Sequence, residues 1–344
     1  MSGSRTRTTC ALASVATVLA AAAIGVAAPS SVGADREPTA LHGVPLRGAT
    51  GLRILAADNP PLVLDVDAGR ATPLRHVPIL QRGFVEVVDV GGQSAAVFAR
   101  TGRHSDIYGV RDRAARVAVL GDGAAIAAAA DGRSVWIKAY ARSRCTLRQH
   151  SVEGMQVRAP RAFRCATTIA SGGSLGIIVN RTRVIDPKTG QTLLRTRWGV
   201  YAAVGRTLLL ASPGRTLTIV DASGRVLRRL EWPSRLVGLD HPAADSHGRY
   251  LALAFGSPAQ QAFDVWLLDT KTMRLTQLPG MPILVPLKRT SMVWTNDGQL
   301  VLLTQKSGRL AVVLWRPGEK SLTVKTLPLR DQRAGNSDSF AVLG

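Results

Sequence analysis

The sequence predicts an all-β fold assembled from a repeated unit of four strands, and three observations support this prediction. Apolar runs of five to seven residues recur along the chain at intervals of 32 to 50 residues. A turn rich in Asp, Glu, Pro or Gly follows each run, as expected for short strands joined by tight connections. No convincing long amphipathic helix is present. Seven units with this period are typical of a seven-bladed β-propeller of four-stranded antiparallel blades.

The strongest strand of each unit can be placed directly from the apolar runs. In chain order these runs are residues 52–57, 94–99, 134–140, 175–179, 207–211, 249–255 and 299–305. A shorter run precedes several of them, for example residues 200–204 and 292–295. Residues 124–130 are six alanines and one isoleucine, which favours a helix locally. Their position and the glycines beside them nevertheless predict the first strand of the third unit.

The two ends of the repeat region complement each other. The first unit lacks a preceding short run, whereas residues 340–343 at the C-terminus form one additional apolar strand. We therefore expect this last strand to complete the first blade and close the ring. Closure of this kind hides sheet edges that would otherwise be free to pair with other chains.

The N-terminus has the features of an export signal. Arg5 and Arg7 precede a run of small apolar residues at 10–28, and no acid is present in this stretch. We interpret residues 1–28 as a signal peptide, 29–49 as a linker and 50–344 as the β-propeller domain. The alternative is an uncleaved membrane anchor, since 19 residues can span a bilayer, but alanine inserts weakly. The protein is then exported, either secreted or associated with the cell envelope, and touches a membrane only through an uncleaved signal.

The chain is strongly basic. Its formal net charge is +21, and 37 of its 44 basic residues are arginine, because only seven are lysine. Cleavage after residue 28 removes two arginines and no acids, which leaves +19. Such a charge favours anionic partners, and export makes nucleic acid a poor candidate. The alternative is that the arginine content reflects codon composition, which the even spread of arginines favours. We expect a monomer.

Two cysteines remain in the predicted mature chain, Cys145 and Cys165. An even number in an oxidising compartment indicates a disulfide. The midpoint between them is residue 155, next to the turn at residues 152–154, so a hairpin centred there places the two sulfurs nearly opposite each other. The alternative is a pair of buried free thiols.

Several turns resemble those of a known group of propellers. Residues 245–252, DSHGRYLA, and 296–301, NDGQLV, resemble the SPDGRYLA turn and strand of TolB-type and YVTN-type propellers. Residues 131–136 are a looser copy, and residues 186–198 and 221–232 are similar to the repeat of quinoprotein-like propellers. The resemblance covers residues 51–344 as a pattern, with sharp motifs in about four blades, and no Trp-Asp dipeptide occurs. It implies an exported binding or scaffold protein, by analogy with the fold.

The strongest candidate for a ligand site combines two imidazoles and two carboxylates within eight residues: Asp240, His241, Asp245 and His247. Such groups can bind a metal or move protons. The segment also fits a loop between two inner strands, in which Asp245 only shapes a turn. Because loops of this kind lie at the mouth of a propeller, the four residues are candidates for ligand binding. We predict no catalytic residues, no metal site and no cofactor.

The tryptophans offer one further candidate. Four of them lie within predicted strands, whereas Trp198 and Trp232 end outer strands, where an aromatic platform for sugars is the alternative to simple packing. The sequence therefore predicts a non-catalytic module that binds a protein or an anionic envelope polymer, or that helps to assemble another envelope complex. The alternative is a propeller enzyme, a glycosidase, lyase or quinone-dependent dehydrogenase, with its site residues spread over several blades.

Overall fold

The computed structural model describes residues 36–344, apart from 102–103, 112–113, 142–143, 164, 166–167, 287–289 and 331–338. The chain divides into two units, residues 1–32 and 33–344. The first unit, with the predicted signal peptide of residues 1–28, lies outside the described residues. Strands dominate the described part of the second unit, where no helix is long and apolar enough to cross a membrane.

The described strands form seven sheets, each built on four antiparallel strands. The first sheet is β31 (Phe340–Val342), β3 (Arg53–Ala56), β4 (Leu62–Asp65) and β5 (Arg70–Pro73). The second is β6 (Phe84–Gly91), β7 (Ser94–Thr101), β8 (His104–Arg111) and β9 (Arg116–Asp122). The third is β10 (Ala125–Ala128), β11 (Ser134–Ala141), β12 (Arg144–Ser151) and β13 (Gln156–Phe163).

The fourth sheet is β14 (Ile169–Ser171), β15 (Ile177–Val179), β16 (Arg183–Ile185) and β17 (Thr192–Arg195), with a 3₁₀ turn η1 (Gly173–Leu175) between its first two strands. The fifth is β18 (Gly199–Val204), β19 (Thr207–Ser212), β20 (Thr216–Asp221) and β21 (Val226–Glu231). The sixth is β22 (Gly238–Ala244), β23 (Tyr250–Ser257), β24 (Ala262–Asp269) and β25 (Arg274–Gln277), and the seventh is β27 (Ser291–Trp294), β28 (Leu300–Lys306), β29 (Arg309–Trp315) and β30 (Thr323–Arg330).

The apolar runs found in the sequence all fall on the second strand of a sheet: β3, β7, β11, β15, β19, β23 and β28. Residues 94–99 of β7 and 300–304 of β28 are buried throughout, with no alternation between the two faces. A strand covered on both faces is expected to show a continuous apolar run. The alanine-rich residues 124–130 contain strand β10, because its pairing with β11 outweighs the local preference of alanine for helix.

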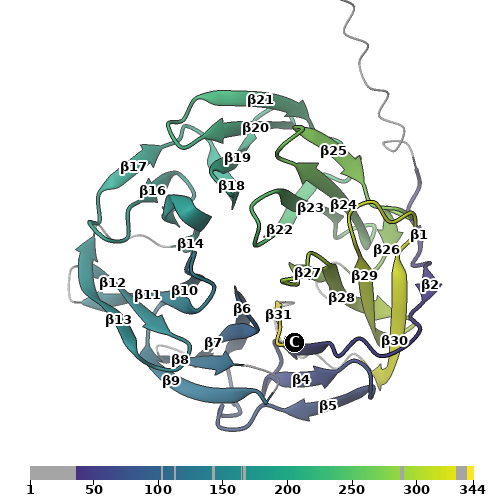
Figure 1. Ribbon diagram of the computed structural model, residues 1–344, viewed down its shortest axis with the longest axis horizontal. Helices are drawn as coiled ribbons and strands as arrows, with labels where there is room; N and C mark the ends of the chain where they lie inside the picture. The colour runs from purple at the N-terminus through teal and green to yellow at the C-terminus, as the bar shows by residue number, and fades with distance from the viewer. Residues whose placement is uncertain are drawn as a thin grey trace, which may run out of the picture. The chain divides into compact units, whose positions relative to one another are not determined.

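The buried apolar side chains of the described residues form seven clusters, and each cluster lies between two consecutive sheets. One of them packs the seventh sheet against the first and includes Phe340 and Val342 of β31. β31 pairs with β3 and also contacts β6 and β27 of the two neighbouring sheets. Figure 1 shows the sheets side by side around a central opening, with the first strand of each sheet nearest to it.

Part of the predicted linker of residues 29–49 pairs with the outside of two sheets. β1 (Thr39–Ala40) runs parallel to β26 (Ile283–Leu284), which extends the sixth sheet, and β2 (Val44–Pro45) runs parallel to β30. Between them Leu41 is buried in the apolar cluster that joins the sixth and seventh sheets. The sequence of this stretch shows no strand period, because each strand is only two residues long.

Candidate functional site

The turn between β22 and β23 holds two of the four candidate residues. One carboxylate oxygen of Asp245 accepts hydrogen bonds from the backbone N–H groups of Arg249 (2.8 Å) and Tyr250 (2.7 Å), and the side chain is buried. His247 is exposed, and its Nδ1 lies 3.8 Å from the other carboxylate oxygen of Asp245. Asp245 therefore shapes the turn, as its resemblance to the repeat motif implies. His247 is the member of this pair that solvent reaches.

The other two candidates lie earlier, on β22 itself. The pairing of β22 with β23 is irregular between Asp240 and Ala243, and Asp240 is placed by its backbone opposite Ala254. His241 is exposed, and its charge acts on Glu86 of β6, a strand of the second sheet. The structure thus brings Asp245 and His247 together, whereas His241 interacts electrostatically with Glu86 of another sheet. Within the described part of the chain, no group of three or more His, Cys, Asp or Glu residues could hold a metal ion.

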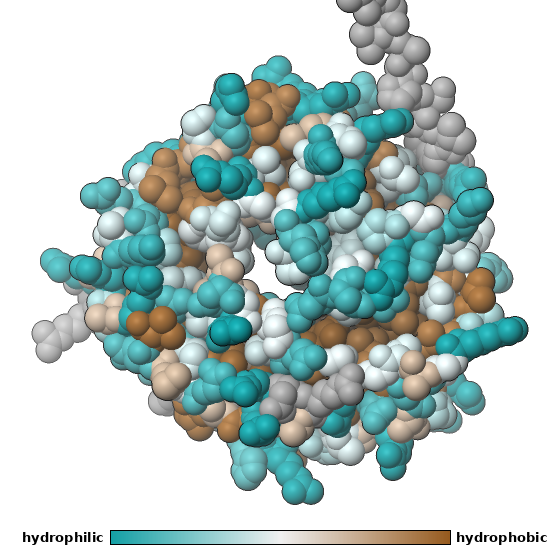
Figure 2. Space-filling model, in the orientation of Figure 1, coloured by the Kyte–Doolittle hydropathy of each residue, from teal (hydrophilic) through white to brown (hydrophobic). Residues whose placement is uncertain are grey.

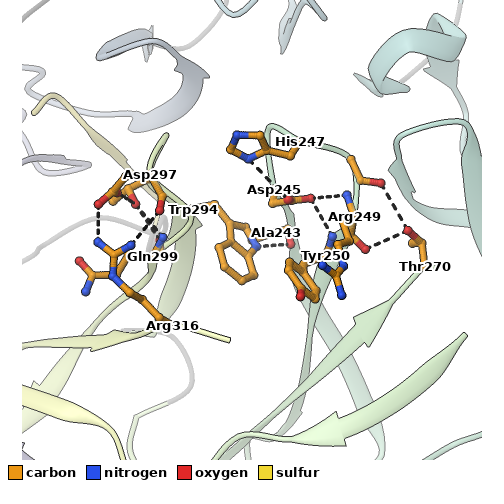
Figure 3. Close-up of polar contacts among 12 residues, drawn as sticks. Ala243, Asp245, His247, Arg249, Tyr250, Thr270, Trp294, Asp297, Gln299 and Arg316 are labelled. Carbon is orange, nitrogen blue, oxygen red and sulfur yellow. Dashed lines mark hydrogen bonds and ion pairs between the residues drawn. The ribbon is translucent and has the colours of Figure 1, made fainter. Parts of the chain in front are cut away.

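A cavity of about 460 Å³ lies beside this turn, between the sixth and seventh sheets. It is lined by Asp245, His247, Arg249, Tyr250, Gly298, Arg316 and Pro317. Figure 3 shows the two walls of this region: Asp245, Arg249 and Tyr250 on one side, and Asp297 and Arg316 on the other. The rings of Tyr250 and Trp294 stack between them, with centroids 6.2 Å apart.

Both arginines of this cavity already have a carboxylate partner. Arg249 forms an ion pair with Asp269 at 3.0 Å, and Arg316 forms one with Asp297. Burial opposes ionisation of Asp269, but hydrogen bonds from Arg249 and from the N–H of Lys271 hold its pKa below the usual range. Hydrogen bonds from Thr295 and Arg316 likewise lower the pKa of Asp297. The charges of this cavity are therefore balanced internally.

The first strand of the second sheet, β6, carries two acids that no sequence motif singled out. Burial raises the pKa of Glu86, and the nearby His241 opposes that rise. Burial also raises the pKa of Asp89 to about 6, although its carboxylate accepts hydrogen bonds from the N–H groups of Val342 (3.1 Å) and Gly91 (2.7 Å). Val342 belongs to β31, so Asp89 links the C-terminal strand to the second sheet.

Because the pKa of Asp89 is raised, we expect its contribution to the free energy of unfolding to fall as pH rises. Between pH 4 and about 6 the folded carboxyl keeps a proton that the unfolded chain has lost, so ionisation opposes folding in this window. A shift of this size corresponds to at most about 3 kcal/mol, since one pKa unit is about 1.4 kcal/mol. We expect Asp89→Asn to remove that fall, since the amide never ionises.

The test is urea unfolding of both proteins at pH 4.5 and 7, read as the wild-type free energy of unfolding minus that of the variant. Taking the difference cancels the carboxylates with lowered pKa values, such as Asp221, which are common to both proteins and act in the opposite direction. A difference that stays constant between the two pH values would show that Asp89 ionises normally in the folded protein.

The structure joins the two cysteines in a disulfide, with Cα atoms 4.8 Å apart. Cys145 lies on β12, fully buried, and pairs across the sheet with Phe163 of β13, two residues before Cys165. The bond ties the outermost strand of the third sheet to its neighbour.

The outer strands β13, β17 and β21 expose a series of arginines, which in the sequence stood out only as part of the total charge. All but the last residue of β13 is exposed, and β21 exposes all of its residues except Leu230. The exposed arginines of the three strands are Arg158, Arg161, Arg195, Arg228 and Arg229. No described carboxylate lies within 4 Å of any of them, unlike Arg249 and Arg316. Figure 2 shows hydrophilic side chains over much of one face of this unit, around the central opening.

No protein-family profile matches the sequence, and no curated protein matches it either. Solved structures are similar in fold. The β-propeller domain of the Trilobed protease from Pyrococcus furiosus has 11% identity and a TM-score of 0.52, and the alignment covers 86% of this chain and 98% of that one. A putative 6-phosphogluconolactonase from Bacteroides fragilis has 10% identity and a TM-score of 0.51, over 87% of this chain and 100% of that one.

A crystal structure of TolB from Acinetobacter baumannii is also similar, with 13% identity over 87% of this chain and 68% of that one. Its TM-score of 0.49 is too low to support a closer comparison. At identities this low the comparisons show the fold alone. The chain is similar to β-propellers, which confirms the all-β propeller fold predicted from the repeats.

Proposed function

We propose that the protein is an exported, non-catalytic β-propeller that binds an anionic polymer of the cell envelope. In this proposal the seven sheets are seven blades, and β31 closes their ring by completing the first blade. Seven apolar clusters, one between each pair of consecutive sheets, support this arrangement. The pairing of β31 with β3 supports closure by the C-terminal strand.

Export is supported by two observations. The N-terminal 28 residues have the charge and the apolar run of a signal peptide. The disulfide between Cys145 and Cys165 fits an oxidising compartment outside the cytoplasm. With the signal removed, the repeat domain would leave the cytoplasm with a net charge of +19, from 21 − 2.

The observation that carries the binding proposal is the set of exposed arginines on β13, β17 and β21. A guanidinium without a carboxylate partner is a preferred group for binding carboxylate or phosphate, because its N–H donors match both oxygens of such a group. Arg161, Arg195 and Arg228 come from three consecutive sheets, so the basic surface extends across three consecutive outer strands. An extended anionic chain fits such a surface better than a small compact ligand.

A second candidate function rests on Glu86 and Asp89. Acids with raised pKa values are common among catalytic groups, because a general acid must keep its proton near neutral pH. An enzyme of the glycosidase or lyase class would use these acids together with groups from other sheets. Asp89 already accepts two backbone hydrogen bonds, one of them from β31, so a structural role accounts for it more directly.

Binding to an anionic polysaccharide is expected to be saturable and to weaken steeply with salt. If about four arginines contact the polymer, counterion release predicts a loss of affinity on the order of a hundredfold between 50 and 200 mM salt. Co-sedimentation of the purified protein with a carboxylated polysaccharide measures this, and a neutral polysaccharide of the same backbone is the control. Equal retention by the neutral polymer, or none by the acidic one, would contradict the proposal.

A further inference from the structure

A second cavity of about 460 Å³ opens between the outer parts of the fourth and fifth sheets. This size lies within the usual range of about 300–1,000 Å³ for small-molecule sites. We call it the Arg195 cavity. Its lining includes Arg195, Arg197, Trp198, Ser212, Thr218 and Arg229.

The cavity exists because the apolar packing between these two sheets stops short of their outer strands. The cluster between them contains six buried residues, the smallest of the seven clusters, and includes Leu210 and Val220. Leu210 of β19, Thr218 of β20 and Arg229 of β21 lie opposite one another across the strands. This row leads from the apolar cluster at Leu210 to the outer strand at Arg229. Thr218 is buried, and its hydroxyl lies 3.0 Å from that of Ser212. The cavity therefore combines an apolar floor with the buried hydroxyl of Thr218 and the half-buried hydroxyl of Ser212.

Three arginines line this cavity, and their charges are not balanced as in the cavity beside Asp245. No described carboxylate lies within 4 Å of Arg195, Arg197 or Arg229, whereas Arg249 and Arg316 each pair with an aspartate. Glu231 lies two residues beyond Arg229, opposite Thr216, but it does not line the cavity. Three like charges around one space repel each other, and an oxyanion held between them relieves that repulsion.

Trp198 supplies an aromatic wall next to these charges. The indole is half-buried against the cluster of the fourth and fifth sheets, and the guanidinium of Arg197 lies 4.7 Å from the ring centroid. An inorganic anion would use only the arginines and leave the half-buried indole and the exposed Val226 in contact with water. A sugar ring presents an apolar C–H face to an indole and hydroxyl groups to threonine and serine, so it uses every kind of group in the lining.

We propose that the Arg195 cavity binds one acidic sugar residue, a ring that carries a carboxylate or phosphate group. This inference rests on the proposed function, because the residue would belong to the anionic polymer. Arg195 and Arg229 bind the oxyanion, Thr218 and Ser212 offer hydroxyls to the ring, and Trp198 covers its apolar face. The cavity then selects acidic sugars, and the remaining arginines of β13 and β21 hold the rest of the chain by charge.

The test measures binding of short oligosaccharides by calorimetry with the purified full chain. The probes are a trimer of galacturonic acid, a phosphorylated hexose trimer, a neutral hexose trimer and inorganic polyphosphate. Removing a charge-assisted hydrogen bond typically weakens binding about tenfold or more. We expect Arg195→Ala with Arg229→Ala to weaken binding of the better acidic trimer at least tenfold. The pair Arg75→Ala with Arg82→Ala removes the same charge at two exposed positions outside the cavity and outside β13, β17 and β21, and should change binding less than twofold.

Thr218→Val keeps the volume of the buried side chain and removes its hydroxyl. It should weaken binding of the acidic trimer and leave polyphosphate binding unchanged. This difference distinguishes contacts to the sugar ring from contacts to its charged group. Preference for the galacturonic or the phosphorylated trimer identifies the oxyanion. Equal losses of affinity in the two double-arginine variants would contradict binding in the Arg195 cavity, but would leave the proposed polymer binding intact. If polyphosphate binds as tightly as both acidic trimers, the proposal that the cavity recognises a sugar ring is wrong. If wild type binds no long polymer either, the proposed function itself fails.

Discussion

Removal of residues 339–344 is expected to leave the domain unfolded at room temperature, so that no cooperative melting transition is observed. These residues include β31, and Phe340, Ala341, Val342 and Leu343 are all buried, in the clusters on both sides of the first sheet. Burying a Phe, Val or Leu side chain contributes about 1.5–3 kcal/mol each, so three of them approach the whole stability of a typical domain, about 5–15 kcal/mol.

The strand also supplies hydrogen bonds to two sheets. The Leu343 N–H donates to the Arg53 carbonyl at 2.8 Å, and the Val87 N–H donates to the Ser339 hydroxyl at 2.9 Å. Its loss exposes one edge of β3 and the faces of two apolar clusters. Circular dichroism during heating and size-exclusion chromatography measure the result. Deleting Gly344 alone is the control, and should cost no more than about 1.5 kcal/mol for its carbonyl hydrogen bond to Arg53. A six-residue truncation that melts like the full chain would show that β31 does not close the ring.

Loss of the disulfide is the second large effect. It closes a loop of 20 residues, for which chain entropy predicts about 3 kcal/mol of stabilisation. For a domain of about 300 residues we expect the melting temperature of the Cys145→Ala, Cys165→Ala variant to fall by about 5 °C. The loop holds β13, whose exposed arginines belong to the proposed binding surface.

Reductant provides the control for this prediction. It should lower the melting temperature of the wild type toward that of the double variant and leave the variant unchanged. Thiol titration of an unfolded, unreduced chain that lacks residues 1–28, and with them Cys10, should find no free thiol. Two free thiols, or a wild type insensitive to reductant at its melting point, would show that the two cysteines are not bonded in the purified protein.

Much of the fold could be predicted from the sequence because its second strands are buried on both faces. The centre of such a run, for example residues 300–303, stays apolar without alternation, and the spacing of the runs is the spacing of the sheets. The same regularity placed residues 124–130 in a strand against their helix propensity. The pairing of residues 39–45 with β26 and β30 could not be predicted, because strands of two residues leave no periodic signal.

The site was harder to predict, because closeness in sequence is a poor guide to closeness in space within a propeller. Asp240, His241, Asp245 and His247 are neighbours in the chain, yet His241 acts on Glu86 and Asp245 is occupied by the backbone of its turn. Arg195 and Arg229 are 34 residues apart and line one cavity. Alternation along β21 shows that Arg228 and Arg229 point to opposite faces of the strand. Only the packing between the fourth and fifth sheets shows that a cavity remains there.

The central claim, binding of an anionic polymer by the exposed arginines, is tested most directly by the salt dependence of affinity. The logarithm of the association constant for a long carboxylated polysaccharide is plotted against the logarithm of salt concentration, for wild type and for a variant with Arg161, Arg195, Arg228 and Arg229 replaced by glutamine. We predict that the slope of the variant is smaller by about three to four, close to one for each arginine. Equal slopes in the two proteins would contradict the claim.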